Sequence, residues 1–198
     1  AGRNLNLTAA AIVNDAKTSG GSSSNTTTLI AGNDVNLTSV SEDSANHIVW
    51  DRHNQRRDSQ RTDVGTRIQT QGDVQIASGH DVNLKAATVH SEQGAVNINA
   101  ERNVSVAAGS SERHVNEVHQ HTEHGMVSST TRRQRDVVNE QAAIGSTLSG
   151  HTVALEAGND VRVTGSQAIS TAGTSIDANN NVAIEAATNT RQVTHTYQ

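Results

Sequence analysis

The sequence predicts an all-β fold, a three-faced parallel β-solenoid with about 21–22 residues per coil. Two observations carry this prediction. A nine-residue motif with apolar ends, first seen as LIAGNDVNL, recurs along the chain, and successive apolar pairs follow at short, regular intervals. The composition is the second observation. The chain has no Phe, Cys or Pro, so Val, Ile, Leu and Ala must form the core, which suits thin stacked layers.

Each copy of the motif predicts one short strand after a tight corner. Its apolar residues alternate with polar ones, which is the pattern of a strand with one buried face. Gly, Asn, Asp, His or Arg comes just before the strand, as is typical of a corner. The five copies occupy residues 29–37, 76–84, 98–106, 155–163 and 176–184.

The spacing of the apolar pairs favours a coil over a meander of hairpins. The valines at 74, 82, 89, 96 and 104 lie seven or eight residues apart, so three strands and three corners take 22 residues. A meander would place turn signals on both sides of longer strands. We therefore expect Val74 to stack on Val96, and Val82 on Val104. Each fully buried side chain of this kind contributes roughly 1.5–3 kcal/mol.

A longer repeat overlies the short one, because the stretch from Val64 to Gly109 aligns with that from Ile144 to Thr188. The chain also begins inside a copy of the repeat, so residues 1–198 are expected to be one continuous β-helical segment of a larger protein. VGT and IGS recur where the coils resume, and EHGMV (Glu123–Val127) predicts a turn. Coil blocks are expected at about 1–37, 64–106 and 144–187, with irregular or hairpin-like excursions at about 38–63, 107–143 and 188–198.

Composition and charge exclude several classes of function. The net charge of −5 does not favour polyanion binding by the whole chain. Without Cys there are no disulfides, and no apolar run approaches the roughly 20 residues of a membrane span. The excursions lack the aromatic platforms that stack nucleic-acid bases, so no nucleic-acid partner is expected.

The run IGSTLSGHTVALEAGNDVRVTGSQAISTAGTSI resembles the haemagglutinin repeat of filamentous haemagglutinin and of contact-dependent growth inhibition exoproteins, which belong to two-partner secretion systems. The resemblance implies a right-handed β-helical filament that passes an outer-membrane partner transporter and is secreted or displayed at the bacterial cell surface. It also implies a role in adhesion or in delivering a toxin, with no catalytic residue and no cofactor. We therefore expect a structural shaft segment and not an enzyme.

Asp and Asn residues at the corners are the first candidate site, because some β-helical proteins degrade polysaccharides. Glycoside hydrolysis needs two carboxyl groups about 5–9.5 Å apart. The predicted register instead pairs each carboxylate with an amide, which favours structural corner residues over this less favoured enzymatic alternative. The pairs are Asp81 with Asn103, Asp160 with Asn181, and Asp34 with Asn4.

A histidine-rich stretch in the second excursion suggests a metal site. On a strand, His119, His121 and Glu123 would point to one face, a plausible ligand set for Zn²⁺ or Ni²⁺. Their spacing matches no established zinc motif, so a solvated arm without metal is the expectation.

Two basic runs in the excursions offer the second hypothesis for function, a glycan- or receptor-binding adhesin module. Arg is suited to bidentate contacts with anionic groups of a host or bacterial cell-surface partner. Interleaved Asp and Glu favour a solvated face of mixed charge instead. Trp50 is expected to pin its excursion to the solenoid, with a partner contact as the alternative. The candidate ligand contacts are Trp50, Arg52, Arg56, Arg57, Arg132, Arg133 and Arg135.

Overall fold

The computed structural model describes residues 2–15 and 25–198, and its regular elements are all strands. The strands form two compact units. We call the first unit the shaft; it comprises Ala1–Val40, Asp63–Gly109 and Ala143–Ala187. The second comprises Ser41–Thr62, Ser110–Ala142 and Thr188–Gln198. We call the five-stranded sheet of this second unit the arm sheet.

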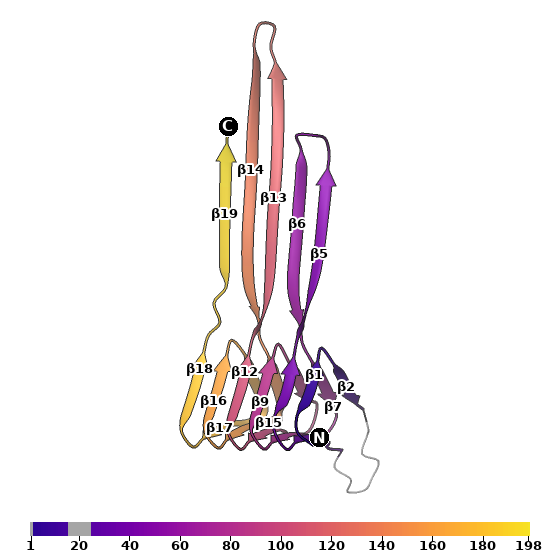
Figure 1. The fold of residues 1–198 in the computed structure, drawn as a ribbon, viewed down its shortest axis with the longest axis vertical. Helices are drawn as coiled ribbons and strands as arrows, with labels where there is room; N and C mark the ends of the chain where they lie inside the picture. Colours follow the sequence, from indigo (N-terminus) through magenta and orange to yellow (C-terminus); the bar gives the residue numbers. More distant parts are fainter. Residues whose placement is uncertain (1, 16–24) are drawn as a thin grey trace. The chain divides into compact units, whose positions relative to one another are not determined.

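The first face of the shaft is a six-stranded parallel sheet (Figure 1). In spatial order its strands are β1 (Leu5–Thr8), β4 (Val35–Thr38), β9 (Asp81–Lys85), β12 (Asn103–Ala107), β16 (Asp160–Thr164) and β18 (Asn181–Glu185).

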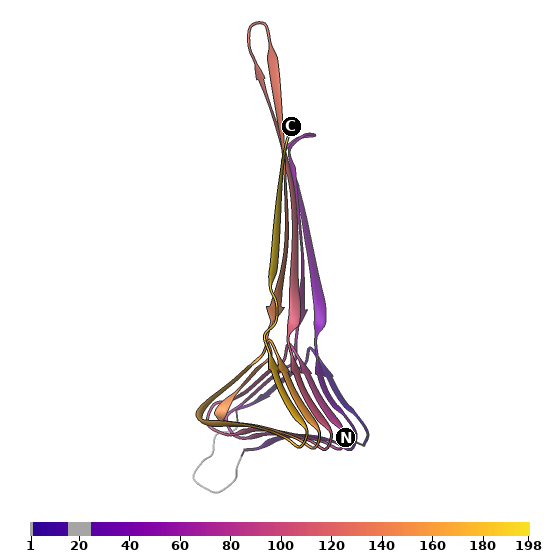
Figure 2. The same ribbon diagram turned by 90° about the vertical axis from the view of Figure 1, so that its left-hand side faces the viewer.

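The other two faces share one sheet, because two long strands run through both faces. Figure 2 looks onto the resulting triangular coils. The second face contains β2 (Ala11–Asn14), β7 (Arg67–Thr70) and β10 (Thr88–Ser91). The third contains β3 (Thr27–Ala31), β8 (Val74–Ser78) and β11 (Val96–Ala100). The shared strands are β15 (Thr147–Ala157) and β17 (Gln167–Ala178).

The register within the shaft confirms the predicted parallel β-helix. Val74 lies opposite Val96 in the β8–β11 pair, and Val82 lies opposite Val104 in the β9–β12 pair. Small aliphatic side chains from all three faces point inward and form one buried core. Such a core needs no aromatic residue, because each coil covers the apolar side chains of its neighbour.

One corner of the shaft distinguishes alternate coils. After β1, β9 and β16 the chain turns through a single left-handed residue, respectively Ala9 (φ 46°), Ala86 (φ 50°) and Gly165 (φ 55°). After β4, β12 and β18 the chain instead leaves the coil for the arm sheet. Every second coil therefore carries an excursion at the same corner.

The VGT and IGS motifs form the points at which the chain re-enters the shaft. The Thr66 hydroxyl donates to the Leu7 carbonyl (2.9 Å), and the Ser146 hydroxyl donates to the Ala107 carbonyl (2.7 Å). A Cβ on Gly65 would lie 1.8 Å from the Ala86 carbonyl oxygen, so only glycine fits there. The motif thus ties each re-entering strand to an earlier coil.

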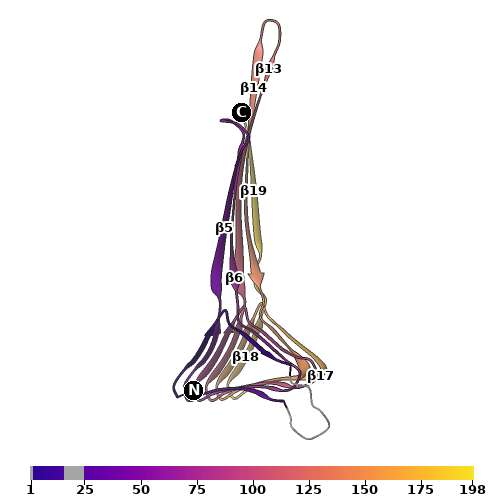
Figure 3. The same cartoon turned by 90° about the vertical axis from the view of Figure 1, so that its right-hand side faces the viewer.

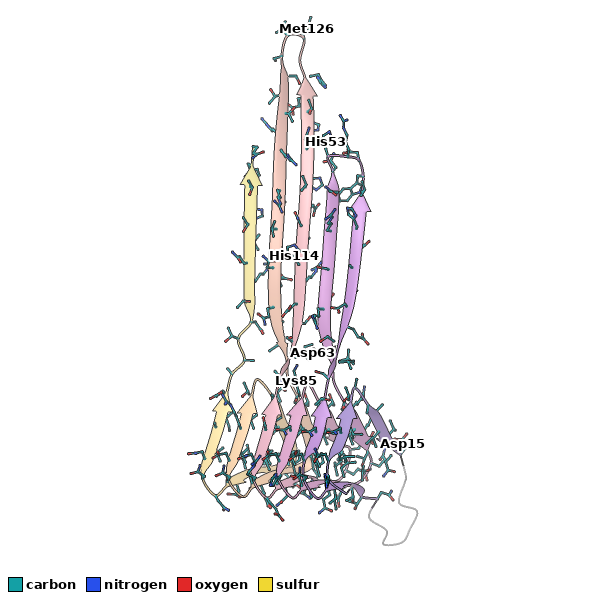
Figure 4. The ribbon with its side chains drawn as sticks, in the orientation of Figure 1. Asp15, His53, Asp63, Lys85, His114 and Met126 are labelled. Atoms are coloured by element: carbon teal, nitrogen blue, oxygen red, sulfur yellow. The ribbon has the colours of Figure 1, made fainter. Side chains whose placement is uncertain are left out.

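The arm sheet is antiparallel and regular, so the irregular alternative for the excursions is wrong. In spatial order its strands are β19 (Thr190–Tyr197), β14 (Ser129–Ile144), β13 (Gly109–His124), β6 (Gln55–Val64) and β5 (Val40–Val49). Figure 3 shows these strands edge-on as a single layer. The predicted turn is confirmed: the Gly125 N–H donates to the Ser128 carbonyl (2.7 Å), and Met126 lies at this hairpin tip (Figure 4).

Candidate functional site

The Asn and Asp residues at one corner of the shaft form a continuous hydrogen-bonded column, which we call the corner ladder. It consists of Asn4, Asp34, Asp81, Asn103, Asp160 and Asn181. In every step a side-chain oxygen accepts the backbone N–H of the next ladder residue, at 3.0–3.4 Å. The side chains therefore satisfy backbone groups that a corner would otherwise leave unpaired.

The three carboxylate–amide pairs predicted from the sequence are present, but the expectation that no two carboxylates adjoin is wrong. Asp34 also neighbours Asp81, because β4 stacks directly on β9 once the first excursion leaves the shaft. Arg102 offsets this repulsion by pairing with Asp81. Its guanidinium holds the pKa of Asp81 below the ordinary 3.8, so the Asp81 carboxylate stays ionised beside Asp34.

One face of the arm sheet, which we call the valine face, contains Val115, Val138 and Val193. Val138 lies opposite Val193 in the β14–β19 pair, and Val115 is almost fully buried. Around these valines the charges pair with each other: Arg113 with Asp58 (2.7 Å), Arg191 with Glu140 (2.7 Å), His195 with Asp136 (2.7 Å), and Arg56 with Glu117 (3.7 Å).

The opposite face, which we call the arginine face, includes two arginines without acidic partners among the described side chains, Arg57 and Arg135, whereas Arg61 is paired with Asp43. Arg57 lies opposite Asn116 in the β6–β13 pair, and the Arg135 Nε donates to the Asn116 side chain (3.1 Å). Within the described residues no ion pair joins Arg57 or Arg135 to a carboxylate. Strand alternation places Arg133 on this face and Arg132 on the valine face.

The basic runs are therefore divided between surfaces instead of forming one patch. Arg56 lies on the valine face with Glu117, whereas Arg57 lies on the arginine face. Arg52 is exposed in the turn between β5 and β6. Figure 4 labels its chain neighbour His53.

Trp50 has a partner that the sequence did not indicate. It stacks on His119 of the neighbouring hairpin, with 5.5 Å between ring centroids and 23° between planes, and 55% of its surface stays exposed. The sequence predicted that Trp50 would contact the solenoid, whereas the contact observed lies within the arm sheet. Trp50 lies at the end of β5 and His119 on β13, with β6 between these strands, so the rings meet across β6.

The proposed metal trio does not converge. His119 is bound to Glu117 and stacked on Trp50, and the His121 Nε2 is 3.8 Å from Glu123. Across residues 2–15 and 25–198, no group of three His, Cys, Asp or Glu side chains is placed to hold a metal ion. His119, His121 and Glu123 do lie on one strand, β13, but His119 pairs with Glu117 of the same strand and stacks on Trp50 instead of converging with the other two.

Comparison with known proteins places this fold in a family. The profile described as "Hemagglutinin repeat" matches residues 50–139 and 127–198, which together make up most of the chain. The chain belongs to the haemagglutinin repeat family. The matched residues include four of the five strands of the arm sheet, β6, β13, β14 and β19, so the excursions are part of this haemagglutinin repeat just as the coils are.

A curated relative supports the same assignment. The chain is 31% identical over 144 residues to a protein named tRNA nuclease CdiA-2 from Burkholderia pseudomallei (strain 1026b). The alignment covers 72% of this haemagglutinin-repeat chain but only 5% of the relative's length. No solved structure matches the chain. In the part of the chain that the structure describes, no helix is long and apolar enough to cross a membrane.

Two buried hydroxyls of this haemagglutinin repeat were missed as important residues. Thr66 and Ser146 also accept the backbone N–H groups of Ala10 (3.3 Å) and Ala87 (3.0 Å). Their recurrence in VGT and IGS was visible in the sequence. Their bonds were not, because each hydroxyl bonds residues at least 28 positions away along the chain.

Proposed function

We propose that this haemagglutinin-repeat chain is a non-catalytic shaft segment of a large exoprotein exported by two-partner secretion. In this role it is secreted or surface-displayed after passing an outer-membrane partner transporter. It holds other parts of the exoprotein, which serve adhesion or toxin delivery, away from the cell. The stacking of coils is the observation that carries this proposal: in-register parallel pairs join every coil to the next, from β1 to β18.

The geometry supports a mechanical role over a catalytic one. The buried interior is filled with aliphatic side chains, and in the corner ladder the side-chain oxygens accept hydrogen bonds from backbone N–H groups. The activity in the relative's name, tRNA nuclease, is not assigned to this chain, because the alignment covers 5% of that protein.

A deletion of one whole repeat tests the shaft role. Removing residues 66–145 from the parent exoprotein joins Gly65 to Ser146, which is equivalent to Thr66, and removes two coils and one hairpin. We expect export and surface display to persist, measured by antibody labelling of intact cells. The matched control removes residues 66–134 and joins Gly65 to Arg135 inside β14, which should block display.

Two outcomes would contradict the shaft role. Loss of display in the in-phase deletion would show that these coils are not interchangeable spacers. Retained display with loss of the parent's adhesion or toxin activity would assign a specific activity to the deleted residues.

A second candidate function is adhesion through the arginine face, favoured by the absence of acidic partners at Arg57 and Arg135 among the described residues. Such guanidinium groups remain available to an anionic surface. We expect the double variant Arg57→Ala/Arg135→Ala to reduce binding of the purified chain to bacterial cells. Arg113→Ala, which removes an arginine already paired with Asp58, is the control. Equal binding by the two variants would reject this second function.

A further inference from the structure

The two aromatic residues of the chain lie in the same small region. Trp50 and Tyr197 are the single Trp and the single Tyr, and the chain has no Phe. Both belong to the arm sheet, and both are largely exposed, Trp50 at 55% and Tyr197 at 70%. The shaft core is built without an aromatic ring, so neither residue serves it. Exposed aromatic residues are concentrated at binding surfaces.

The strand register aligns these rings in one row across the valine face. Tyr197 lies opposite Gln134 in the β14–β19 pair. The side-chain bonds His114–Asn139 and Thr122–Thr131 fix the β13–β14 register, which places His119 opposite Gln134. Trp50 then stacks on His119. We call Tyr197, Gln134, His119 and Trp50 the aromatic row.

A groove of about 600 Å³ adjoins the aromatic row on the same face. Val115, Val138 and Val193 are among its lining residues, and two residues further along each strand come Glu117, Asp136 and His195. The aromatic row follows after two more residues on each of these strands. From Trp50, at the end of β5, to Tyr197 on β19 the row crosses four strand spacings, or about 19 Å.

The charges that line this groove argue for an uncharged ligand. The side chains of Arg56, Arg113, Arg191 and His195 are each within ion-pair distance of a carboxylate of the same sheet. A polyanion would have to break these pairs, and a polycation would meet the same arginines. Paired side chains still offer hydrogen-bond donors and acceptors, since an ion pair uses only part of the capacity of each group.

We propose that the valine face of the arm sheet binds an uncharged carbohydrate chain. The apolar C–H faces of the sugars stack on Trp50 and Tyr197, and the valines provide an apolar floor. Gln134 lies between the rings, and its amide forms hydrogen bonds with the sugar hydroxyls. The free lone pairs of Glu117 and Asp136 accept further hydrogen bonds from these hydroxyls. This binding goes beyond the proposed shaft role and does not depend on it.

The sole tryptophan makes the proposal directly testable, because all indole fluorescence comes from Trp50. The full 198-residue chain is titrated with maltohexaose, cellohexaose, mannohexaose and N-acetylchitohexaose, with a heparin hexasaccharide as the polyanion. We expect at least one neutral hexasaccharide to change the Trp50 emission with saturable binding that isothermal titration confirms. Because no net charge is involved, added salt should leave the affinity unchanged.

Variants then locate the site. Tyr197→Ala should weaken binding of that hexasaccharide about tenfold, the scale of one lost aromatic contact, and Tyr197→Phe should preserve it. Trp50→Ala, followed by calorimetry, should weaken binding similarly. Arg61→Ala on the arginine face, which removes an arginine paired with Asp43, is the matched control and should bind normally. Circular dichroism checks that each variant is folded.

Several results would overturn the proposal. One is the absence of binding by all four neutral hexasaccharides. Another is binding of the heparin hexasaccharide but of no neutral hexasaccharide, with an affinity that falls as salt is added. That result would place the site on the arginine face. Normal affinity in both Tyr197→Ala and Trp50→Ala would also overturn it. None of these results bears on export or display of the shaft, so the two proposals fail separately.

Discussion

Ser78 is a buried hydroxyl in a column of small inward side chains. Its neighbours in the same column of the third face are Ala31 and Ala100, and its own side-chain oxygen has no hydrogen-bond partner among the described residues. Burying a hydroxyl without a partner costs free energy that alanine at this position would not.

We therefore expect Ser78→Ala to raise the free energy of unfolding by about 1 kcal/mol, measured by chemical denaturation. Ser146→Ala is the matched control, because the Ser146 hydroxyl is equally buried but fully bonded. It should lower the free energy of unfolding by roughly 1–3 kcal/mol. The explanation fails if both variants move in the same direction.

The corner ladder makes the stability of the shaft depend on pH. Arg102 holds the pKa of Asp81 below the ordinary 3.8, through a side-chain hydrogen bond first and charge second. Because the folded pKa is the lower one, this carboxylate stabilises the fold above pH 3.8, and the stabilisation is lost as the pH falls through the folded value.

We expect the unfolding midpoint of the chain to fall on acidification below pH 3.8, and Asp81→Asn to reduce that fall. The amide oxygen of Asn still accepts the Asn103 N–H, so the variant should lose little stability at neutral pH beyond its ion pair with Arg102. Thermal unfolding followed by circular dichroism across this range is the measurement. An identical acid profile for wild type and variant would show that other carboxylates, such as Asp58 and Asp136, govern the response.

At the scale of elements, the hairpin is an insertion at a defined corner. In the β9–β10 coil one left-handed residue, Ala86, replaces everything that lies between Ala107 and Ser146 in the β12–β15 coil. The coil therefore does not require the hairpin in order to close.

We predict that excising residues 109–145 with Ala108→Gly leaves a folded shaft. The new glycine then occupies the left-handed position, as Gly165 does in a later coil. The excised chain should keep a cooperative thermal transition. Excising residues 108–145 instead removes the corner residue as well, and should lower the transition temperature markedly. Loss of the transition in the first variant would mean that the coil depends on its hairpin.

The elements differ in how far the sequence alone predicts them. The strands around Val82 and Val104 were predictable, because one apolar face and a fixed coil length repeat together. The joining of β5, β6, β13, β14 and β19 into one sheet was not. Both faces of this single layer meet solvent, so most positions show no apolar alternation. The contacts of Trp50 with His119 and of Asp34 with Asp81 were not predictable from the sequence either, because each joins segments that are distant in sequence.

At the scale of the whole 198-residue chain, the inward side chains of the middle coils are covered more fully than those of the last coil. Ile98 lies on a central coil and is 1% exposed, whereas Ile184 on β18 is 67% exposed. Both side chains occupy inward positions of the motif, so they differ in how far neighbouring coils cover them.

We expect Ile98→Ala to lower the free energy of unfolding by roughly 2–5 kcal/mol and Ile184→Ala by less than about 0.5 kcal/mol. Denaturation with guanidinium chloride measures both. Similar losses in the two variants would mean that something other than a following coil already covers Ile184.

The alternation of plain and hairpin-bearing coils constrains how such proteins change in length. Hydrogen-bonded strands are about 4.8 Å apart in any sheet. Two coils therefore advance the helix by about 9.6 Å, and one hairpin, with its two strands, widens the antiparallel sheet by the same amount. The length added to the helix therefore equals the width added to the antiparallel sheet only when coils are gained or lost in pairs. A single inserted coil would leave consecutive hairpins half a period out of step, so duplication and recombination in such genes should preserve an even number of coils.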